Sequence, residues 1–397
     1  MGFAAYSTQY DWERIASYKK KACRAEGGMV DLSIGSPVDP VPDVVREALA
    51  AHADGTDAHG YPATKGGRML REAITRWFEN KRQVDLAALH ADVVPTMGSK
   101  EAVALMASLL HLGPGDVVVQ PAVSYPTYEI GTQLAGAKAL KVPDVSDVRS
   151  WVGVSGVKAV WVNSPCNPTG EVLSPDRLAA VVQAARSIGA VVLSDECYAL
   201  LNWAGGVRGR DGGDAPAVNE AGGLGMELPA PSPSMLDLEV CSGSAEGVLV
   251  LYSLSKQSNM AGYRTALVAG DMGLVEEQTA YRRQIGQIIP GPVQAAMAAA
   301  LDDEASVSEQ HNRYRARLVR LVEALREYGY DARMPQGGLY VWVKAIDGDC
   351  WSDMERLADI GIVPSPGEFY GAPDRLRFSV TATDDSIDAA VDRLRSR

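Results

Sequence analysis

The sequence is poor in the residues that build metal sites and disulfide frameworks. Its 397 residues include five cysteines and five histidines, which are scattered and form no Cys-x-x-Cys or Cys/His grouping. A chain of this length does not need disulfides to hold its core together. No histidine stands in a serine and aspartate context that indicates a hydrolytic triad. We therefore expect no disulfide framework and no metal centre, with Cys166 and Cys197 as small buried side chains.

A basic surface and a long apolar run are also absent. The formal net charge is −12 at neutral pH, which argues against a nucleic-acid partner because such a partner requires a basic face. No segment approaches the roughly 20 apolar residues that span a bilayer. Residues 1–13 lack the basic-then-apolar pattern of a signal peptide. We expect a cytoplasmic protein that binds any anionic substrate through locally placed arginines.

From residue 42 to about residue 271, strand-like and helix-like segments alternate. Ser174 and Pro175 form a typical helix start, as N-cap and first helical residue. The almost continuous apolar runs, which are typical of strands buried on both faces, cover residues 116–120, 157–163, 190–194 and 248–252. This alternation predicts the α/β class, with a mainly parallel sheet covered by helices. Such sheets bind ligands beyond the carboxyl ends of their strands.

The C-terminal part has an α+β pattern. A last helix, over residues 386–394, is expected to open at Asp384 or Asp385. The other expected elements are helices over residues 307–328 and 351–360 and strands over residues 339–343 and 375–380. We expect a large domain over residues 42–285 and a smaller, discontinuous domain built from residues 1–41 and 286–397. Residues 204–247 are rich in Gly, Pro, Ser and Asp and predict a flexible insertion, either solvated or acting as a lid.

The most informative motif is the run Ser-Leu-Ser-Lys-Gln-Ser-Asn-Met-Ala-Gly-Tyr-Arg over residues 253–264, directly after a predicted buried strand. An ammonium group in such a place is costly to bury unless it is neutralised. A Schiff base between Lys256 and an aldehyde cofactor removes this cost. Ser253, Ser255 and Arg264 are then placed to hold a phosphate group. The alternative is an ordinary surface lysine at a strand end, because short motifs often arise by chance.

Polar residues follow two other predicted strands. In residues 163–170, two prolines and a glycine hold Asn167 between rigid elements. In residues 194–198, Asp195 and Glu196 form a pair of adjacent carboxylates that is costly to bury unless each finds a partner. A carboxylate facing a pyridine nitrogen keeps that nitrogen protonated, and Tyr198 is placed to reach a phenolic oxygen of the same ring. A carboxylate that caps the next helix is the alternative.

A third cluster, Gly98-Ser99-Lys100, lies in a glycine-containing turn that opens a helix. Free backbone N–H groups and the helix dipole make such a turn an anion site. The cluster is not a P-loop, because the upstream glycine at the required spacing is missing. No Gly-x-Gly-x-x-Gly follows the first strand, so a nicotinamide-binding fold is disfavoured.

Together these motifs resemble those of the fold-type I pyridoxal-phosphate-dependent aminotransferases of the aspartate aminotransferase superfamily. The resemblance covers nearly the full length and includes the order and spacing of Asn167, Asp195 and Tyr198 and of Lys256 and Arg264. It implies pyridoxal 5′-phosphate as cofactor. It also implies a large domain with a mainly parallel seven-stranded sheet, a smaller α+β domain and a homodimer with shared active sites.

The resemblance also implies roles for single residues. Lys256 corresponds to the lysine that forms the Schiff base, Asp195 to the partner of the pyridine nitrogen, and Tyr198 and Asn167 to the hydrogen-bonding partners of the ring oxygen. Tyr125 corresponds to the aromatic residue that stacks on the cofactor. The residues that correspond to the phosphate site are Gly98, Ser99, Lys100, Ser253 and Arg264, together with Tyr61, which reaches the phosphate of the neighbouring subunit.

For the substrate, Arg377 corresponds to the arginine that binds the α-carboxylate, with Asn167 beside it and a backbone contact from Gly35. Four segments are similar to N-succinyldiaminopimelate aminotransferases, over residues 11–19, 30–42, 255–264 and 366–371. This similarity implies ping-pong transfer from glutamate to N-succinyl-2-amino-6-oxopimelate, in lysine and diaminopimelate biosynthesis. The additional carboxylates of that acceptor need a further cation, for which the candidates are Lys19, Lys65, Lys100, Arg208 and Arg282.

Three other functions remain open at this point. An aspartate or aromatic aminotransferase would share every cofactor residue and differ only in the side-chain pocket. A carbon–sulfur lyase of the same fold would keep the lysine but release pyruvate and ammonia. A regulator that uses the fold as a sensor usually carries a helix-turn-helix domain, for which the residues before Asp11 are too few.

Overall fold

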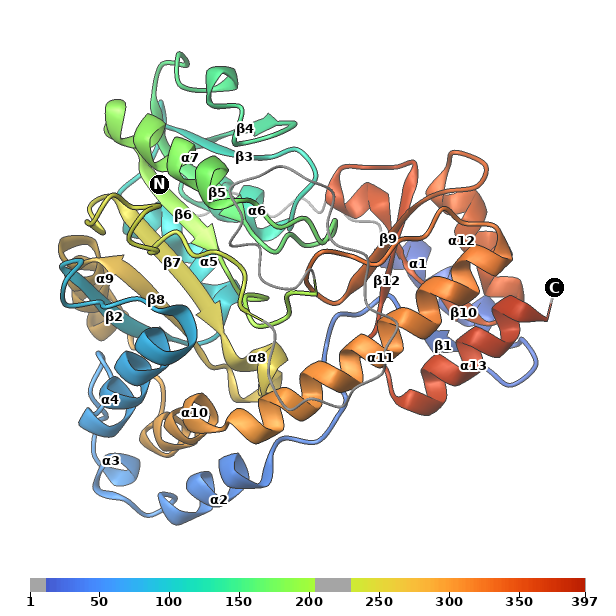
Figure 1. Cartoon of the computed structure of the whole chain (residues 1–397), viewed down its shortest axis with the longest axis horizontal. Helices are drawn as coiled ribbons and strands as arrows, with labels where there is room; N and C mark the ends of the chain where they lie inside the picture. The colour runs from blue at the N-terminus through green and yellow to red at the C-terminus, as the bar shows by residue number, and fades with distance from the viewer. Residues whose placement is uncertain (1–11, 204–229, 397) are drawn as a thin grey trace.

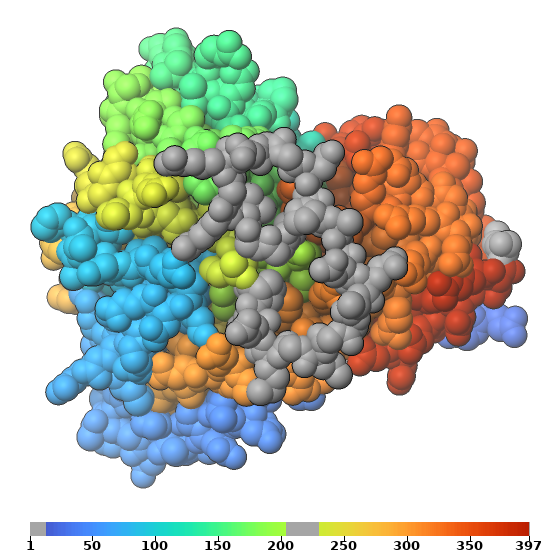
Figure 2. Space-filling view, viewed as in Figure 1, coloured from blue at the N-terminus to red at the C-terminus, as the bar shows by residue number. Residues whose placement is uncertain are grey.

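The computed structural model describes residues 12–203 and 230–396. These residues form two units that lie side by side, a large sheet flanked by helices and a smaller unit with a sheet of its own (Figure 1). The space-filling view shows the same units as two lobes, with a notch between them at the top of the view (Figure 2).

The large sheet has seven strands in the order β2-β8-β7-β6-β5-β3-β4. Only β8 runs antiparallel to its neighbours, so the expected mainly parallel seven-stranded sheet of an α/β protein is confirmed. Four strands lie where the apolar runs predicted them, namely β3 (Val117–Pro121), β5 (Val157–Asn163), β6 (Val191–Asp195) and β7 (Val248–Ser253). The others are β2 (Ala91–Thr96), β4 (Lys138–Val142) and β8 (Ala266–Asp271).

Helices cover both faces of this sheet. Strand residues alternate between two apolar clusters, so that Leu193 and Leu249 pack in the cluster that contains α5, whereas Val192 and Val250 pack in the cluster that contains α7. Ser174 caps α7 as expected, accepting a hydrogen bond from the Arg177 backbone N–H at 3.4 Å. The helices are α2 (Asp43–Ala51), α3 (Thr56–His59), α4 (Arg68–Trp77), α5 (Ser99–Leu109), α6 (Thr127–Leu134), α7 (Pro175–Ser187), α8 (Leu254–Gln257), α9 (Met272–Ile285) and α10 (Gly291–Asp302).

The smaller unit contains the antiparallel sheet β11-β12-β9 and joins both ends of the described chain. The N-terminal strand β1 (Val30–Asp31) pairs with β10 (Ile362–Val363), as expected for an N-terminal segment that packs with the C-terminal part. The boundaries at residues 41 and 285 stay a prediction. The remaining elements are α1 (Trp12–Ala22), α11 (Glu304–Tyr328), β9 (Tyr340–Lys344), α12 (Cys350–Asp359), β11 (Ser365–Pro366), β12 (Arg375–Ser379) and α13 (Asp384–Arg395).

Two sequence-based expectations need correction. Thr383, and neither Asp384 nor Asp385, is the N-cap of α13, because its side-chain oxygen accepts the Ser386 backbone N–H at 3.2 Å. The two aspartates occupy the first turn, where negative charge is also favourable. The helix expected from residue 307 begins one turn earlier, at Glu304 after the N-cap Asp303.

The segment expected to be a flexible insertion is in part a packed element. Residues 204–229 lie outside the described residues. Over residues 230–247, by contrast, Met235 and Leu236 are fully buried and the Ser234 hydroxyl donates to Glu196 at 2.9 Å. The apolar anchors are too few and too irregularly spaced to show a periodic pattern, which is why the sequence suggested a solvated loop.

Candidate active site

A cavity of about 630 Å³ lies at the carboxyl ends of β5, β6 and β7 and reaches across to the small sheet. This is the edge at which parallel sheets bind ligands. The structure brings most of the predicted site residues together here. Those that line the cavity are Gly35, Ser99, Lys100, Tyr125, Asn167, Asp195, Tyr198, Ser253, Lys256, Arg264 and Arg377.

Lys256 lies in the short helix α8, immediately after β7. Its Nζ donates to the backbone oxygen of Gly35, which belongs to the N-terminal segment. Burial lowers the pKa of Lys256, because the charged form loses its hydration. A larger neutral fraction makes the amine a better nucleophile and base.

The adjacent carboxylates of Asp195 and Glu196 have separate partners. Asp195 accepts hydrogen bonds from the Tyr128 hydroxyl at 2.8 Å and the Cys197 backbone N–H at 3.2 Å, and it lines the cavity. Burial raises the pKa of Asp195, and these hydrogen bonds act in the opposite direction. Glu196 instead accepts from Arg82 at 2.6 Å, and both side chains of this ion pair are buried. One carboxylate therefore belongs to the cavity and the other to the structural core.

The first turn of α5 and the Arg264 guanidinium form a basic recess. Gly98, the N-cap of α5, has a φ of 85°, which favours glycine. A Cβ atom on Gly98 would lie 2.2 Å from Arg264 Nη2, so any other residue would displace the Arg264 guanidinium. Arg264 donates to the Ala261 backbone oxygen at 2.7 Å, which holds its guanidinium beside the free N–H groups of the helix. Ser99 and Lys100 follow in that helix turn.

Arg377, on β12, is the buried cation of the opposite wall. Its Nη1 donates to Asn167 Oδ1 at 2.9 Å and its Nη2 to the Ser33 backbone oxygen at 2.8 Å. The buried Nε has no hydrogen-bond partner among the described residues. The guanidinium lies 4.0 Å from the ring centroid of Tyr340 and 4.7 Å from that of Tyr370. The Arg377 guanidinium is thus held in the cavity by hydrogen bonds from Nη1 and Nη2, while its Nε has no partner among the described residues.

Sequence reasoning did not assign Tyr128, Tyr340, Tyr370 or Ser33 to the site. Tyr128 lies three residues after Tyr125, in helix α6, and the partner of its hydroxyl, Asp195, comes from the end of strand β6. Tyr340 donates to or accepts from the Tyr198 hydroxyl at 2.9 Å. An aromatic residue in a strand usually packs in a core, so the sequence carried no signal for this contact.

Several predicted residues lie elsewhere. Tyr61 does not line the cavity and is fully exposed, with 102 % relative accessibility, so its predicted role depends on a partner subunit. Among the cations considered for the distal carboxylates, Lys100 lines the cavity and Arg208 lies outside the described residues. The other three are engaged by carboxylates, as the pairs Lys19–Asp31 at 2.7 Å, Lys65–Asp92 at 2.6 Å and Arg282–Glu101 at 2.7 Å.

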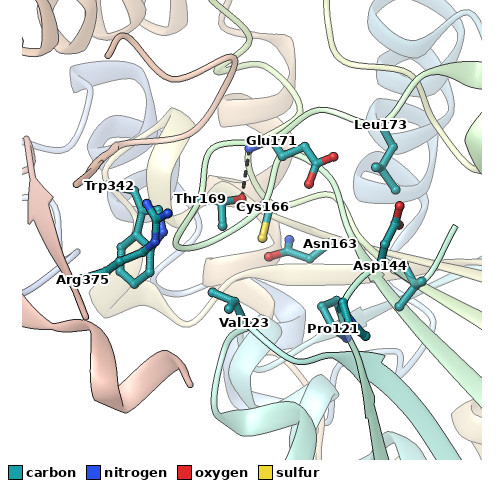
Figure 3. A pocket seen from close by; sticks show the side chains of 12 residues that line it. Pro121, Val123, Asp144, Asn163, Cys166, Thr169, Glu171, Leu173, Trp342 and Arg375 are labelled. Atoms are coloured by element: carbon teal, nitrogen blue, oxygen red, sulfur yellow. Dashed lines mark hydrogen bonds between the residues drawn. The ribbon is translucent and has the colours of Figure 1, made fainter. Parts of the chain in front are cut away.

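A second cavity, of about 350 Å³, adjoins the first through Asn163, which lines both. Figure 3 shows Trp342 and Arg375 of the small unit on one side and Asp144 and Leu173 of the large unit on the other. Arg177 binds the Asp144 carboxylate at 3.0 Å, and the neighbouring Glu171 carboxylate at 2.7 Å. The site residues predicted from the sequence do not line this cavity.

Two properties of the described part of the chain concern metal ions and membranes. Within it, no group of three or more His, Cys, Asp or Glu side chains is arranged to hold a metal ion. None of its helices combines the length and the apolar character that a membrane crossing requires.

Comparison with known proteins agrees with this geometry. The model of the family described as "Aminotransferase class I and II" matches residues 27–394. The chain is 40% identical over 389 residues to "4-dedimethylamino-4-oxo-anhydrotetracycline transaminase OxyQ" of Streptomyces rimosus, covering 97% of this chain and 98% of that protein. It is 39% identical over 396 residues to "Probable aminotransferase Rv1178" of Mycobacterium tuberculosis, covering 99% and 86%. A solved structure described as a probable N-succinyldiaminopimelate aminotransferase, from Thermus thermophilus, superposes with a TM-score of 0.78 at 25% identity, covering 96% and 98%.

Proposed function

The chain belongs to the aminotransferase class I and II family, and we propose that it moves the amino group of glutamate to N-succinyl-2-amino-6-oxopimelate, a reaction of lysine and diaminopimelate biosynthesis. One observation carries this proposal: Lys256 and Arg377 line the same cavity. Lys256 supplies an amine for the substrate Cα, and Arg377 supplies a cation for the α-carboxylate next to it. The acceptor is supported by the four similar segments and by the name of the Thermus thermophilus structure.

Pyridoxal 5′-phosphate is the cofactor of this enzyme, and the donor set of the cavity fits it. The basic recess beside Gly98 has the charge and the hydrogen-bond donors for a phosphate group, which Ser99, Ser253 and Arg264 would hold. The buried carboxylate of Asp195 suits a protonated ring nitrogen. When bound, the cofactor supplies an electron-accepting ring that stabilises negative charge at the substrate Cα.

The residues of the chain supply positioning and proton transfer. Arg377 would bind the substrate α-carboxylate. Asn167 and Tyr198 would hold the cofactor at its phenolic oxygen, and Asp195 would keep its ring nitrogen protonated. Lys256 Nζ would hold the cofactor covalently, and as a free amine it would take the proton from the substrate Cα. Glutamate leaves as its keto acid before the acceptor enters, which gives ping-pong kinetics.

We assign the distal carboxylates of the acceptor to Lys100, because it is the described candidate cation that lines the cavity. We also propose a homodimer in which Tyr61 reaches the phosphate of the partner subunit, because its fully exposed side chain is accessible to a second chain. If this is right, Tyr61→Phe weakens cofactor binding although Tyr61 does not line the cavity of its own chain.

A half-reaction screen tests the substrate. The holoenzyme is mixed with single amino acids, and the loss of the cofactor absorption band is followed by stopped flow. Glutamate and N-succinyl-diaminopimelate are expected to react fastest. A faster response to aspartate or phenylalanine would replace the proposed acceptor with that of an aspartate or aromatic aminotransferase. Release of ammonia together with pyruvate from a cysteine thioether would instead identify a carbon–sulfur lyase.

The similarity to OxyQ favours a second candidate, amino transfer to a polycyclic ketone. It rests on 40% identity that covers 98% of a protein named as a 4-dedimethylamino-4-oxo-anhydrotetracycline transaminase. The same assay separates the two acceptors. The enzyme is first converted with glutamate and then offered either N-succinyl-2-amino-6-oxopimelate or the tetracycline ketone, and the acceptor that restores the absorption band faster is the better substrate.

A further inference from the structure

We propose that Tyr340 is a positioning residue that couples the two halves of the active site, the cofactor oxygen and the substrate carboxylate. The inference rests on the function proposed above and adds to it a residue outside the predicted set. Tyr340 lies at the start of β9 in the small unit, is buried, and lines the cavity.

The hydroxyl of Tyr340 reaches the cofactor side of the site. Its oxygen lies 2.9 Å from the Tyr198 hydroxyl oxygen, and Tyr198 is its hydrogen-bond partner among the described residues. Either hydroxyl can donate in this pair, and the coupling requires that Tyr340 donates to Tyr198, which leaves the Tyr198 hydrogen free to point into the cavity. A phenol that accepts one hydrogen bond becomes a stronger donor in the next. Tyr340 thus strengthens the bond that Tyr198 donates to the phenolic oxygen of the cofactor.

The ring of Tyr340 reaches the substrate side. The Arg377 guanidinium lies 4.0 Å from the ring centroid, at a distance typical of a cation–π contact. Tyr370 contributes a second ring, at 4.7 Å. Because the two rings hold the guanidinium, its orientation toward a carboxylate is set before the substrate arrives.

Gly35 provides the space for this hydroxyl. A Cβ atom at position 35 would lie 2.2 Å from the Tyr340 oxygen, so any other residue would push the phenol away. The backbone oxygen of Gly35 also accepts the hydrogen bond from Lys256. The Tyr340 hydroxyl thus requires glycine at this position, and the backbone oxygen of the same residue holds the reactive amine.

The pH midpoint of the cofactor's visible spectrum measures the proposed coupling. Tyr340→Phe keeps the ring and removes the hydroxyl, so the deprotonated form of the cofactor loses stabilisation and the midpoint rises by about 0.3 to 0.6 pH units. The KM for glutamate stays within about twofold, because the cation–π contact remains. Tyr340→Leu removes both contacts, so the midpoint rises and the KM for glutamate increases by about tenfold.

Two other variants test whether the shift of the midpoint depends on the position of the Tyr340 hydroxyl. Tyr370→Phe removes the hydroxyl of the other ring on Arg377, and this hydroxyl lies 3.3 Å from the Ser365 hydroxyl oxygen. This variant should leave the midpoint unchanged. Gly35→Ala displaces the Tyr340 hydroxyl and raises the midpoint as Tyr340→Phe does. Each variant keeps the ionisable groups around Tyr340 except the one that it replaces. These groups are Lys256, Arg377, Tyr125, Tyr198, Tyr314 and Tyr370.

Tyr198→Phe distinguishes failure of this inference from failure of the proposed function. If Tyr198→Phe raises the midpoint but Tyr340→Phe and Gly35→Ala leave it at the wild-type value, Tyr340 is only a packing residue and the proposed function stands. If Tyr198→Phe itself leaves the midpoint unchanged, the role proposed for Tyr198 is wrong. An equal shift with Tyr370→Phe would also overturn the coupling, because it would show a general effect of removing pocket hydroxyls.

Discussion

The hydroxyl of Tyr128 donates a hydrogen bond of 2.8 Å to Oδ2 of Asp195. The Tyr128 ring is fixed by stacking on Trp161, with 4.6 Å between the ring centroids and 20° between the planes. Tyr128 is fully buried, so its hydroxyl has no water to replace this partner. The carboxylate proposed to face the cofactor nitrogen is therefore held by a rigid donor from the neighbouring helix α6.

Tyr128→Phe should weaken cofactor binding. Without this donor the pKa of Asp195, already raised by burial, rises further, so a smaller fraction is ionised to hold the protonated ring nitrogen. We expect about a tenfold increase in the cofactor dissociation constant and a similar fall in kcat, measured by spectral titration and steady-state kinetics. Tyr330→Phe is a matched control, because its hydroxyl donates to Asp353 at 2.9 Å in the core of the small unit. It should lower the melting temperature without affecting cofactor binding.

Lys256→Ala should abolish turnover and the covalent adduct with the cofactor. The adduct is fixed by borohydride reduction and detected by intact-protein mass spectrometry. Lys65→Ala, in which a lysine paired with Asp92 is lost, should retain both. Turnover that survives the loss of Lys256 would contradict its assignment as the reactive amine.

Arg377→Lys should raise the KM for glutamate by about 10 to 100-fold while the cofactor stays bound. An ammonium group cannot present the planar fork that binds Asn167 and the Ser33 backbone and still offer atoms to a carboxylate. Arg375→Lys tests the position two residues earlier on the same strand, which lines the second cavity. Its KM should remain that of the wild type. An unchanged KM in Arg377→Lys would remove Arg377 from the substrate site.

Arg82→Ala should reduce the free energy of unfolding by about 3–5 kcal/mol, because it leaves the Glu196 carboxylate buried without its cation. The side chains of this pair are only 1% and 2% exposed. Arg68→Ala breaks an exposed pair with Glu72 and should leave the free energy of unfolding almost unchanged, because water screens this pair. Urea unfolding of the two variants measures the difference, and equal losses would contradict the importance assigned to burial.

His311 should make folding stability depend on pH between about 4 and 6.5. Burial lowers the pKa of His311 from 6.5 to about 4, so in this range the unfolded chain binds a proton that the folded chain does not. The contribution of His311 to the free energy of unfolding is fully present above pH 6.5. As the pH falls from 6.5 to 4, the free energy of unfolding decreases by about 3 kcal/mol. His311→Leu should remove this part of the acid sensitivity. Identical pH profiles of unfolding for the two proteins would disprove it.

The reactive residues were predictable because they follow buried strands directly. Lys256 and Asp195 each stand just after or at the end of an apolar run, and parallel strands bring such ends to one edge of a sheet. Tyr340 and Tyr128 were not predictable, because their contacts are made between elements far apart in the chain and their residue type also suits a core. Strand β4 was not predicted for a simpler reason: it is a short edge strand in which two of the five residues, Lys138 and Lys141, are exposed lysines.

The ion pair between Arg82 and Glu196 also has a consequence for the register of the chain at the end of β6. Successive residues of an extended chain point to opposite faces, so a slip by one residue would turn Glu196 toward the cofactor and Asp195 toward the core. Arg82 opposes such a slip, because Glu196 has the reach that this pairing needs and Asp195 is one methylene shorter. A contact remote from the chemistry thereby selects which of two adjacent carboxylates meets the ring nitrogen.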